Sequence, residues 1–378
     1  MKSKKIILIR SSEATIDVRI EKIARSLNKF GHKIEIVCWD RSASLPKIEN
    51  VGYAVINRIG IKSEFGMGIR LLPKLTKFWL RTFIWLLKNN FDAIHSCDFD
   101  TIVPSLPAAK LRNKKIIYDI FDFYSEGGNV PSKLRIVISK IDKFLMRFVN
   151  KIIVVDDARI SFLPKNVMEK VEVIYNSPLD LLEESRIIAN NCNKIPKKSK
   201  AFRLVYSGRI IDGRYIKEMI EAITTINTAE MVIAGFGNLK DISNLENFVS
   251  LKKNISFIGR LTHNESLGLE YTADVIFSLN DPDIPNNKMA SANKLFEAMM
   301  LEKPVVINSG TSMEKKVNKY GCGLVIPAPT VEKIKDAVQH LMSDENTCHV
   351  LGKNGRRAFK NEFSWELMEK KLRSIYSF

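Results

Sequence analysis

The fold of the second half of the chain is decided by the stretch Asn287-Lys-Met-Ala-Ser-Ala-Asn-Lys-Leu-Phe-Glu-Ala-Met-Met-Leu-Glu-Lys-Pro-Val-Val306. Its pattern predicts a polar loop, a short helix and a turn into a buried parallel strand. Asn293 and Lys294 stand where the loop enters the helix, and the free N–H groups and helix dipole there favour an anion. Glu297 lies one turn further along the same helical face. A ligand with both a phosphate and vicinal hydroxyls, such as a nucleotide diphosphate sugar, suits this arrangement. A surface salt bridge between Lys294 and Glu297 is the alternative.

Short apolar runs alternate with amphipathic segments along the whole chain. In the first half these runs predict six buried strands, namely Ile6–Ile9, Ile34–Val37, Ala93–His95, Lys115–Tyr118, Ile152–Val155 and Val171–Ile174. In the second half they predict six more, namely Phe202–Tyr206, Met231–Ala234, Ile255–Ile258, Val275–Ser278, Val305–Ile307 and Leu324–Ile326. Helical patterns between them include Ile20–Lys29 and Ser132–Val149. We therefore expect an α/β protein with two Rossmann-like domains that face each other across a cleft.

A polar, charge-rich segment separates the two series of strands. We expect an N-terminal domain over residues 1–180, a linker over 181–200 and a C-terminal domain over 201–360. The segment 363–376 has the pattern of a capped amphipathic helix, in which Trp365 is a packing anchor.

Composition and charge narrow the class of protein. The chain has 378 residues, of which 45% are hydrophobic and 27% charged, as in soluble globular proteins. No stretch reaches the roughly 18 apolar residues that a transmembrane helix needs. Five cysteines without metal or disulfide spacing indicate a reduced, cytosolic protein. The formal charge of +17 fits an anionic membrane surface or anionic substrates. A nucleic-acid partner is not expected, because no motif of such a protein accompanies the charge.

Two further motifs follow predicted strands of the second half. After the first strand, Gly208 lets the backbone approach a ligand, and Arg209 and Arg214 could converge on a diphosphate. Solvated surface arginines are the alternative. Gly235 and Gly237 end the second strand and permit a tight turn near a nucleotide, although such glycine pairs occur in many turns.

Together these motifs resemble the donor-site signature of retaining GT-B glycosyltransferases of the GT4 type. The family pattern Asn-Lys-x-x-Glu-x-x-Ala-x-Gly-x-Pro-Val corresponds to Asn293-Lys-Leu-Phe-Glu-Ala-Met-Met-Leu-Glu-Lys-Pro-Val305. The spacing is intact, but Leu301 and Glu302 stand where Ala-Leu-Gly-type residues are common, and Met289 stands where many members carry a second glutamate.

The resemblance assigns roles to these residues. It implies that Arg209, Arg214 and Lys294 hold the diphosphate, that Glu297 holds the ribose hydroxyls, and that the loop at Arg260 lies against the base. The family needs no tightly bound metal and no cofactor besides its nucleotide sugar donor. The helix 361–378 is expected to cross back to the N-terminal domain.

Two stretches of the first half resemble acceptor-side motifs of the same family. Asp17-Val-Arg19 is similar to an Asp-x-Arg-Val start, with Asp17 a catalytic candidate and Arg19 on the acceptor side, although an intrahelical ion pair is the alternative. Tyr118-Asp-Ile-Phe-Asp122 is similar to Tyr-Asp-x-His-Glu, so Asp122 is a second catalytic candidate and Phe121 replaces a family histidine. Asp119 and His95 complete the acceptor side. A buried structural role is the alternative for His95.

The segment 71–88 predicts a helix with a basic stripe and two tryptophans, Trp79 and Trp85. This composition suits peripheral contact with a membrane surface, and a core helix with a solvated basic stripe is the alternative.

We therefore expect a retaining, metal-independent glycosyltransferase that moves a sugar from a nucleotide diphosphate sugar to a glycan or lipid-linked saccharide. It would be cytoplasmic or peripheral on the inner face of the cell membrane. Three alternatives remain open, namely a nucleotide-sugar epimerase of the same fold, a degenerate nucleotide-sugar-binding subunit, and a nucleic-acid-binding protein. The last of these is supported by the charge alone.

Overall fold

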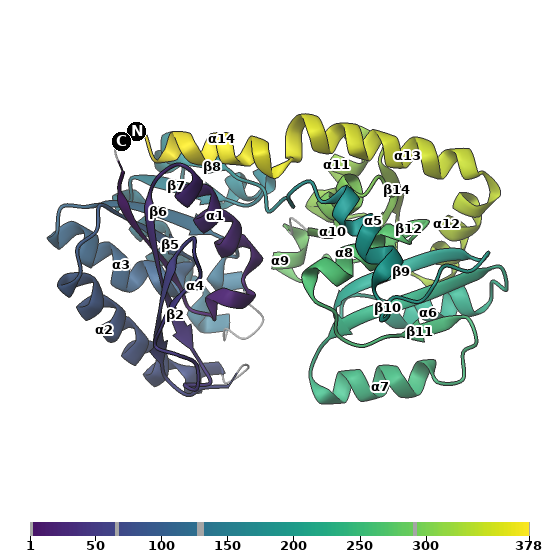
Figure 1. Ribbon diagram of the computed structural model, residues 1–378, viewed down its shortest axis with the longest axis horizontal. Coiled ribbons are helices and arrows are strands. Elements are labelled where there is room, and N and C mark those ends of the chain that lie inside the picture. The colour runs from purple at the N-terminus through teal and green to yellow at the C-terminus, as the bar shows by residue number, and fades with distance from the viewer. Residues whose placement is uncertain (1–2, 65–67, 127–131, 290–292, 378) are drawn as a thin grey trace. The chain divides into compact units, whose positions relative to one another are not determined.

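A computed structural model describes residues 3–64, 68–126, 132–289 and 293–377. The chain divides into two compact units (Figure 1). The first comprises Met1–Tyr175 together with Glu369–Phe378, and the second comprises Asn176–Met368.

The first unit is built on an eight-stranded sheet in the order β3-β4-β2-β1-β5-β6-β7-β8. All neighbours pair in parallel except β3 and β4, which are antiparallel. The strands are β1 (Lys5–Arg10), β2 (Lys33–Asp40), β3 (Ile48–Asn50), β4 (Val55–Gly60), β5 (Ala93–Cys97), β6 (Lys115–Ile120), β7 (Lys151–Val154) and β8 (Val171–Val173). The central strands are wholly buried, which explains why they read as continuous apolar runs.

Helices connect these strands. They are α1 (Val18–Lys29), α2 (Leu72–Lys88), α3 (Phe99–Leu111), α4 (Ser132–Leu145) and the part of α14 (Trp365–Ile375) that belongs to this unit. Short 3₁₀ turns add η1 (Ala14–Ile16), η2 (Gly68–Leu71), η3 (Tyr124–Glu126), η4 (Met146–Phe148), η5 (Asp157–Phe162) and η6 (Lys165–Lys170). Helix α2 packs against α3, and α3 packs against α4, so these three helices form one layer.

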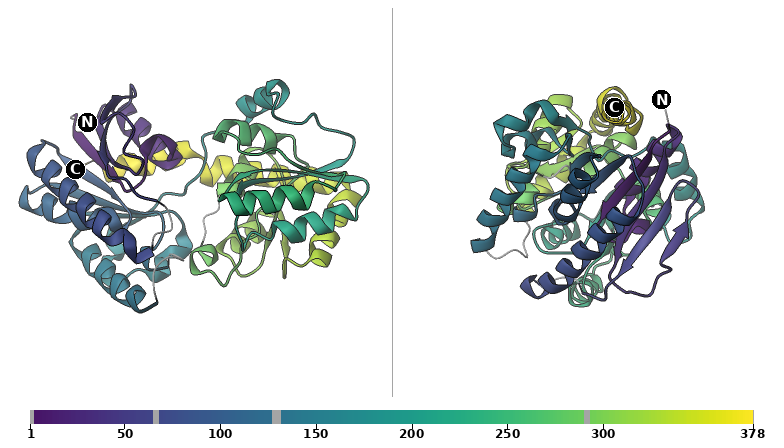
Figure 2. Two further views of the ribbon diagram at one scale, coloured as in Figure 1. Left: turned by 90° about the horizontal axis from the view of Figure 1, so that it is seen from below. Right: turned by 90° about the vertical axis from the view of Figure 1, so that its left-hand side faces the viewer.

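The second unit has a six-stranded parallel sheet in the order β11-β10-β9-β12-β13-β14. Its strands are β9 (Phe202–Arg209), β10 (Ala229–Phe236), β11 (Ile255–Phe257), β12 (Val275–Phe277), β13 (Val305–Asn308) and β14 (Gly323–Ile326). Its helices are α5 (Leu182–Asn191), α6 (Ile216–Thr224), α7 (Leu239–Val249), α8 (His263–Tyr271), α9 (Pro285–Lys288), α10 (Asn293–Met300), α11 (Ser312–Tyr320), α12 (Val331–Ser343) and α13 (Glu345–Ala358), followed by the π-helical turn η7 (Phe359–Phe363). Figure 2 shows helices on both faces of this sheet.

The expected fold class, two Rossmann-like α/β domains, is confirmed. In both sheets the first strand lies in the middle, and the chain first builds outward on one side of it and then on the other. The point where the direction reverses lies between β1 and β5 in the first unit and between β9 and β12 in the second. Ligands of open α/β sheets bind at the carboxyl ends of the strands that flank such a point.

Two features differ from the sequence expectation. The strands β3 and β4 were not predicted, because polar residues such as Asn57 and Arg58 interrupt the apolar pattern of β4. The expected linker, 181–200, contains α5, which packs against α8. Gly268 of α8 allows this close packing, since a Cβ atom there would lie 2.6 Å from Cγ2 of Ile188. The division between the units falls instead at Tyr175 and Asn176.

Candidate functional site

The second unit places two arginines without partners beside its switch point. Arg209 ends β9, and Arg214 lies in the loop that leads to α6. Within the described part of the chain, neither guanidinium has a hydrogen-bond or ion-pair partner. Arg209 is exposed and Arg214 half-buried, so both can accept an anionic ligand. The hydroxyl of Tyr206 donates a hydrogen bond of 2.7 Å to the carbonyl of Arg209 and so fixes the start of this loop.

Lys294 lies in the first turn of α10, the helix of the signature stretch, between two carboxylates. Its Nζ donates hydrogen bonds of 2.6 Å to Oε1 of Glu270 and 2.6 Å to Oε2 of Glu297. Glu270 is wholly buried and Glu297 is 3% exposed. The pKa of Glu270 is raised to about 7, chiefly by burial. Lys294 lowers this pKa, and the charge of Glu297 raises it further. Burial lowers the pKa of Lys294, but the two carboxylates outweigh it and leave that pKa above its usual value. The lysine charge is therefore balanced by neighbouring carboxylates.

Arg214 of this loop and Lys294 both act on one tyrosine. Burial raises the pKa of Tyr206 to about 12, although the charges of Arg214 and Lys294 both act on this tyrosine and lower it. Glu297 also faces a histidine, because its Oε1 lies 3.9 Å from Nδ1 of His263. Arg214 and Lys294 therefore both lie close enough for their charges to act on Tyr206, and Glu297 joins this group through its hydrogen bond with Lys294.

Two other members of the signature stretch have defined positions. The side-chain oxygen of Asn293 accepts a hydrogen bond of 2.8 Å from the amide of Asn176. Met289, which replaces a family glutamate, is buried and ends α9. The loop residues 290–292 lie outside the described residues.

The glycines of the predicted donor site divide into two kinds. A Cβ atom at Gly235 would lie 2.3 Å from the carbonyl oxygen of Gly208, and one at Gly237 would lie 2.6 Å from that of Ile210. Both glycines are therefore required by the packing of β10 against the end of β9. A Cβ atom at Gly208 would meet nothing closer than the Tyr206 hydroxyl at 3.5 Å, so packing within the unit leaves room there.

Arg260 follows β11 and lies near an exposed ring. Its guanidinium carbon is 5.3 Å from the ring centroid of Phe236, which is 49% exposed. The pair forms a cationic and aromatic surface at the end of β10.

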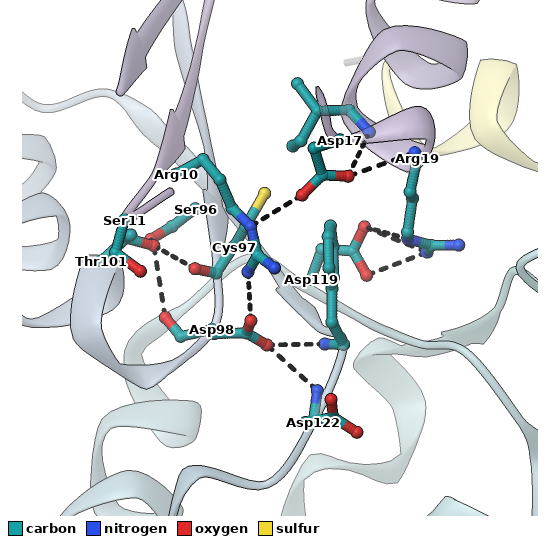
Figure 3. Close-up of polar contacts among 12 residues, drawn as sticks. Arg10, Ser11, Asp17, Arg19, Ser96, Cys97, Asp98, Thr101, Asp119 and Asp122 are labelled. Carbon is teal, nitrogen blue, oxygen red and sulfur yellow. Dashed lines mark hydrogen bonds and ion pairs between the residues drawn. The ribbon is translucent and has the colours of Figure 1, made fainter. Parts of the chain in front are cut away.

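The first unit has a charged cluster at its own switch point (Figure 3). Arg10, the last residue of β1, forms ion pairs with Asp17 and with Asp98, which directly follows β5. Its Nε lies 2.9 Å from Oδ2 of Asp17. Asp17 also caps α1, because its carboxylate accepts the backbone N–H groups of Arg19 and Ile20. The catalytic candidate Asp17 is thus a helix cap that is bound to Arg10.

Asp98 organises the loop that follows β6. Its Oδ1 accepts hydrogen bonds from the backbone N–H groups of Phe121, at 2.7 Å, and Asp122, at 3.1 Å. Its backbone has φ 66° and ψ 169°, a region that residues other than glycine rarely adopt. Burial raises the pKa of Asp98 to about 6, although Arg10 lowers it and Asp100 and Asp122 raise it further. Strain of this kind persists only where the surrounding contacts hold it.

The predicted acceptor-side residues Arg19, His95 and Asp119 contact one another inside the first unit. Arg19 holds Asp119 through two nitrogens, with Nε–Oδ2 at 3.1 Å and Nη2–Oδ1 at 3.0 Å. Nε2 of His95 lies 3.2 Å from Oδ2 of Asp119, and its Nδ1 lies 2.6 Å from the hydroxyl of Tyr376. Burial would raise the pKa of Asp119, but Arg19 and His95 outweigh it and the pKa lies below its usual value. All four side chains are buried, so this group positions the cluster from within.

Phe121 lies against two cations. Its ring centroid is 4.3 Å from the guanidinium carbon of Arg10 and 5.1 Å from that of Arg19. The next residue, Asp122, is 64% exposed at its side chain and accepts a hydrogen bond of 2.9 Å from Nη2 of Arg159. Asp122 therefore remains accessible, whereas the position of the family histidine is taken by an aromatic ring between arginines.

Three residues of these sites were not predicted from the sequence. Arg10 and Asp98 each end or follow a predicted strand, so their position at the carboxyl ends of β1 and β5 was the available signal. Glu270 lies in a helix far from the signature stretch along the chain, and only the folded structure brings it to Lys294.

Neither a metal cluster nor a membrane span is found among the described residues. No group of three or more His, Cys, Asp or Glu side chains there could hold a metal ion. Within the same residues, every helix is too short or too polar to cross a bilayer.

Solved structures share this fold over almost the full chain. Sucrose-phosphate synthase from Thermosynechococcus elongatus has a TM-score of 0.77 and 17% identity, and the match covers 98% of both chains. Anabaena HepE in complex with UDP-glucose has a TM-score of 0.74 and 12% identity, with 99% of each chain covered. The fold is that of the GT-B class of glycosyltransferases.

Family models match both halves of the chain. Residues 16–177 match Glycosyltransferase Family 4, and residues 188–358 match Glycosyl transferases group 1. The chain belongs to the GT4-type glycosyltransferases.

Curated relatives are distant. The capsular polysaccharide biosynthesis glycosyltransferase CapM of Staphylococcus aureus is 26% identical over 181 residues, which are 47% of this chain and 46% of CapM. The glycosyltransferase MJ1069 of Methanocaldococcus jannaschii is 22% identical over 318 residues, or 79% of this chain and 78% of its own. A GDP-mannose-dependent monoacylated α-(1-6)-phosphatidylinositol monomannoside mannosyltransferase of Corynebacterium glutamicum is 24% identical over 202 residues, or 52% and 48% of the two chains. The match thus spans about half the length of the first and third relatives.

Proposed function

We propose that the protein transfers a sugar from a nucleotide diphosphate sugar to a glycan or lipid-linked saccharide, with retention of configuration at the sugar. The observation that carries this proposal is the pair of arginines at and just after the end of β9, which have no side-chain partner among the described residues. One of them, Arg214, acts on the same tyrosine as Lys294. Family membership and the neighbour that binds UDP-glucose support a nucleotide sugar as the donor.

Arg209 and Arg214 would hold the diphosphate and stabilise it as it leaves. Lys294 is balanced by Glu270 and Glu297, whereas Arg209 and Arg214 have no partner among the described residues and are available for this charge. Positive groups fixed where negative charge develops are the main electrostatic contribution to such a transfer. We propose that they replace a metal ion in this role, so that a chelator leaves the activity unchanged.

Glu297 would accept hydrogen bonds from the ribose hydroxyls, and the Arg260–Phe236 surface would lie against the base. Gly208 would allow the backbone to approach the phosphates, since its packing leaves room on that side. In the transfer itself, the bond between the sugar carbon and the diphosphate oxygen breaks as the acceptor oxygen attacks from the same face. The acceptor proton passes to the leaving diphosphate.

The acceptor side is proposed for the first unit, at the Arg10–Asp98–Asp122 cluster. The exposed carboxylate of Asp122 could bind an acceptor hydroxyl, whereas Arg19, Asp119 and His95 would hold the cluster in place. The names of two relatives, a glycosyltransferase of capsular polysaccharide biosynthesis and a phosphatidylinositol monomannoside mannosyltransferase, support a glycan or lipid-linked acceptor. A lipid-linked acceptor would bring the chain to the inner face of the cell membrane, with contact through residues 71–88.

A thermal-shift screen with UDP, GDP, ADP and their common sugars tests the donor site. A ligand at one hundred times its dissociation constant should stabilise the protein by about 2.7 kcal/mol. We expect one base series to stabilise the wild type, and Glu297→Ala and Arg209→Ala to lose the effect. Arg186→Ala is the matched control, because Arg186 lies on α5 in an exposed ion pair with Glu183. No response to any nucleotide would overturn the proposal.

Turnover is measured separately, as release of the nucleoside diphosphate. The anomeric configuration of the product shows whether the configuration at the sugar is retained. Binding without turnover on any acceptor would support the alternative of a sugar-nucleotide-binding subunit.

A further inference from the structure

The helix α4 of the first unit has an apolar stripe that is exposed. Five large hydrophobic side chains follow one another at intervals of three and four residues, so they share one helical face. Their exposed fractions are 39% for Leu134, 51% for Val137, 44% for Ile141, 54% for Phe144 and 43% for Phe148, the last of these in η4.

This stripe is not the face by which α4 packs on its own unit. Asp142 and Met146 lie on the opposite side and are buried, and the carboxylate of Asp142 accepts a hydrogen bond of 2.8 Å from the Tyr118 hydroxyl. The helix therefore has two apolar faces, one that covers the sheet and one that does not. An exposed apolar stripe of this length on a soluble domain marks an interaction surface.

The charges beside the stripe indicate the kind of partner. Lys140, Lys143 and Arg147 lie along its edge at helical spacing, and the only acidic residue between Ser132 and Phe148 is the buried Asp142. A large hydrophobic face bordered by cations and without exposed carboxylates is typical of helices that lie in the interface of an anionic bilayer.

A second helix of the same layer repeats the arrangement. Helix α2 exposes Leu80, Ile84 and Leu87, and its sequence from Leu72 to Lys88 contains basic residues but no acidic one. Trp79 of this helix is only partly exposed, and its indole N–H donates a hydrogen bond of 2.5 Å to the carbonyl of Asp100. The aliphatic side chains, and not Trp79, are the exposed apolar groups of α2.

We propose that the apolar stripe of α4 docks the protein on a bilayer that contains anionic lipids. The side chains of Val137, Ile141 and Phe144 enter the interface between headgroups and acyl chains, and the flanking basic residues contact the lipid phosphates. This surface contains none of the residues proposed for the donor or acceptor site, and the proposal does not rest on either.

Charge argues against a second copy of the chain as the occupant. A symmetric contact would place Lys140, Lys143 and Arg147 of one copy beside the same residues of the other. Like charges at an interface oppose association, whereas anionic headgroups are attracted to this edge.

Sedimentation of the full chain with vesicles tests the proposal. We expect binding to vesicles of phosphatidylcholine mixed with phosphatidylglycerol, and much weaker binding to phosphatidylcholine alone. The variant Ile141→Gln/Phe144→Gln should lower the partition coefficient about ten-fold or more, because two large apolar side chains no longer enter the interface. Lys140→Gln/Lys143→Gln should lower it about five-fold for each charge removed.

The matched control is Leu239→Gln/Leu251→Gln in the second unit, since these side chains are 87% and 94% exposed and lie outside the first unit. It should bind vesicles as the wild type does. All substituted positions are exposed, so the unfolding midpoints and the nucleotide-induced thermal shift should stay unchanged, which separates this test from that of the donor site.

Three outcomes would overturn the proposal. They are a wild type that binds no vesicles, an α4 variant that binds as well as the control, and equal binding to neutral and anionic vesicles. Sedimentation velocity without lipid could give a fourth such outcome. A concentration-dependent dimer that the α4 variant abolishes would make a second copy of the chain the occupant of this surface.

Discussion

Glu270, which is wholly buried, and Lys294, which is partly exposed, form an ion pair in which Oε1 and Nζ are 2.6 Å apart, although they are 24 positions apart in the sequence. Glu297 binds the same ammonium at the same distance. One lysine cannot balance two buried carboxylates, and this is why burial and the second carboxylate favour the protonated form of Glu270. The lysine of the signature stretch is therefore an organiser of buried carboxylates in the folded protein.

Removing Glu270 should destabilise the second unit. Glu270→Ala leaves Lys294 with one buried partner and should lower the free energy of unfolding by about 3 kcal/mol. Glu270→Gln keeps an oxygen that accepts from Nζ and should cost about 1 kcal/mol. Urea unfolding measures both values. Equal losses for the two variants would show that volume, and not the ion pair, matters at this position.

Gly235 and Gly208 should respond differently to the same substitution. Gly235→Ala places a methyl group 2.3 Å from a carbonyl oxygen and should lower the free energy of unfolding by about 3 kcal/mol or more. Gly208→Ala meets only ordinary contacts and should fold normally. If the backbone at Gly208 approaches the phosphates, Gly208→Ala should nevertheless lose the nucleotide-induced thermal shift. A Gly208→Ala protein that binds nucleotide as tightly as the wild type would remove this glycine from the donor site.

Asp98 should be important to the first unit through its carboxylate. Asp98→Ala removes the acceptor of two backbone N–H groups and the partner of Arg10, which are contacts that hold the rare backbone conformation at this residue. We expect a loss of about 3 kcal/mol in the free energy of unfolding. Asp98→Asn retains an acceptor for the loop and should lose less. Chemical denaturation followed by circular dichroism distinguishes the two.

Asp142 should make the stability of the protein depend on pH. Burial raises its pKa to about 7, well above the value of an unfolded aspartate, so the folded state binds an extra proton between about pH 4 and pH 7. Stability from this group is present at the low end of that window and falls as the pH rises through it, by up to about 1.4 kcal/mol per pH unit.

Asp142→Asn cannot ionise and should lack this decline. The difference in unfolding free energy between the variant and the wild type should therefore grow from pH 4 to pH 7 and then stay constant. A difference that is flat over the whole range would mean that Asp142 ionises normally in the folded chain.

The strand pattern was predictable because buried parallel strands are continuous apolar runs. All twelve predicted strands are present. The missed strands β3 and β4 are the edge strand and its neighbour at one end of their sheet, where side chains are less buried. Arg58 of β4 is an extreme case, because it is buried between Glu13 and Glu49 and interrupts the apolar pattern from inside the sheet. Periodicity alone does not reveal such a paired charge.

The sites were predictable only where the relevant residues are close in sequence. Lys294 and Glu297 are three residues apart, and their contact follows from helical geometry. Glu270, Arg10 and Asp98 reach their partners through the order of strands in the sheet, which the sequence does not state. For the same reason Arg19, expected to pair within its own helix or face the acceptor, binds Asp119 one hundred residues away.

The first unit is made of two separate parts of the chain, and this determines when it can complete its folding. Residues 369–378 supply Glu369, which binds Ser26, and Tyr376, which binds His95. A ribosome makes them only after the whole of the second unit, so β1 to β8 must wait with that side uncovered while the inserted unit folds. Removing residues from the last ten positions should therefore lower the folding yield of the first unit more than that of the second unit, although the second unit is the nearer of the two in sequence.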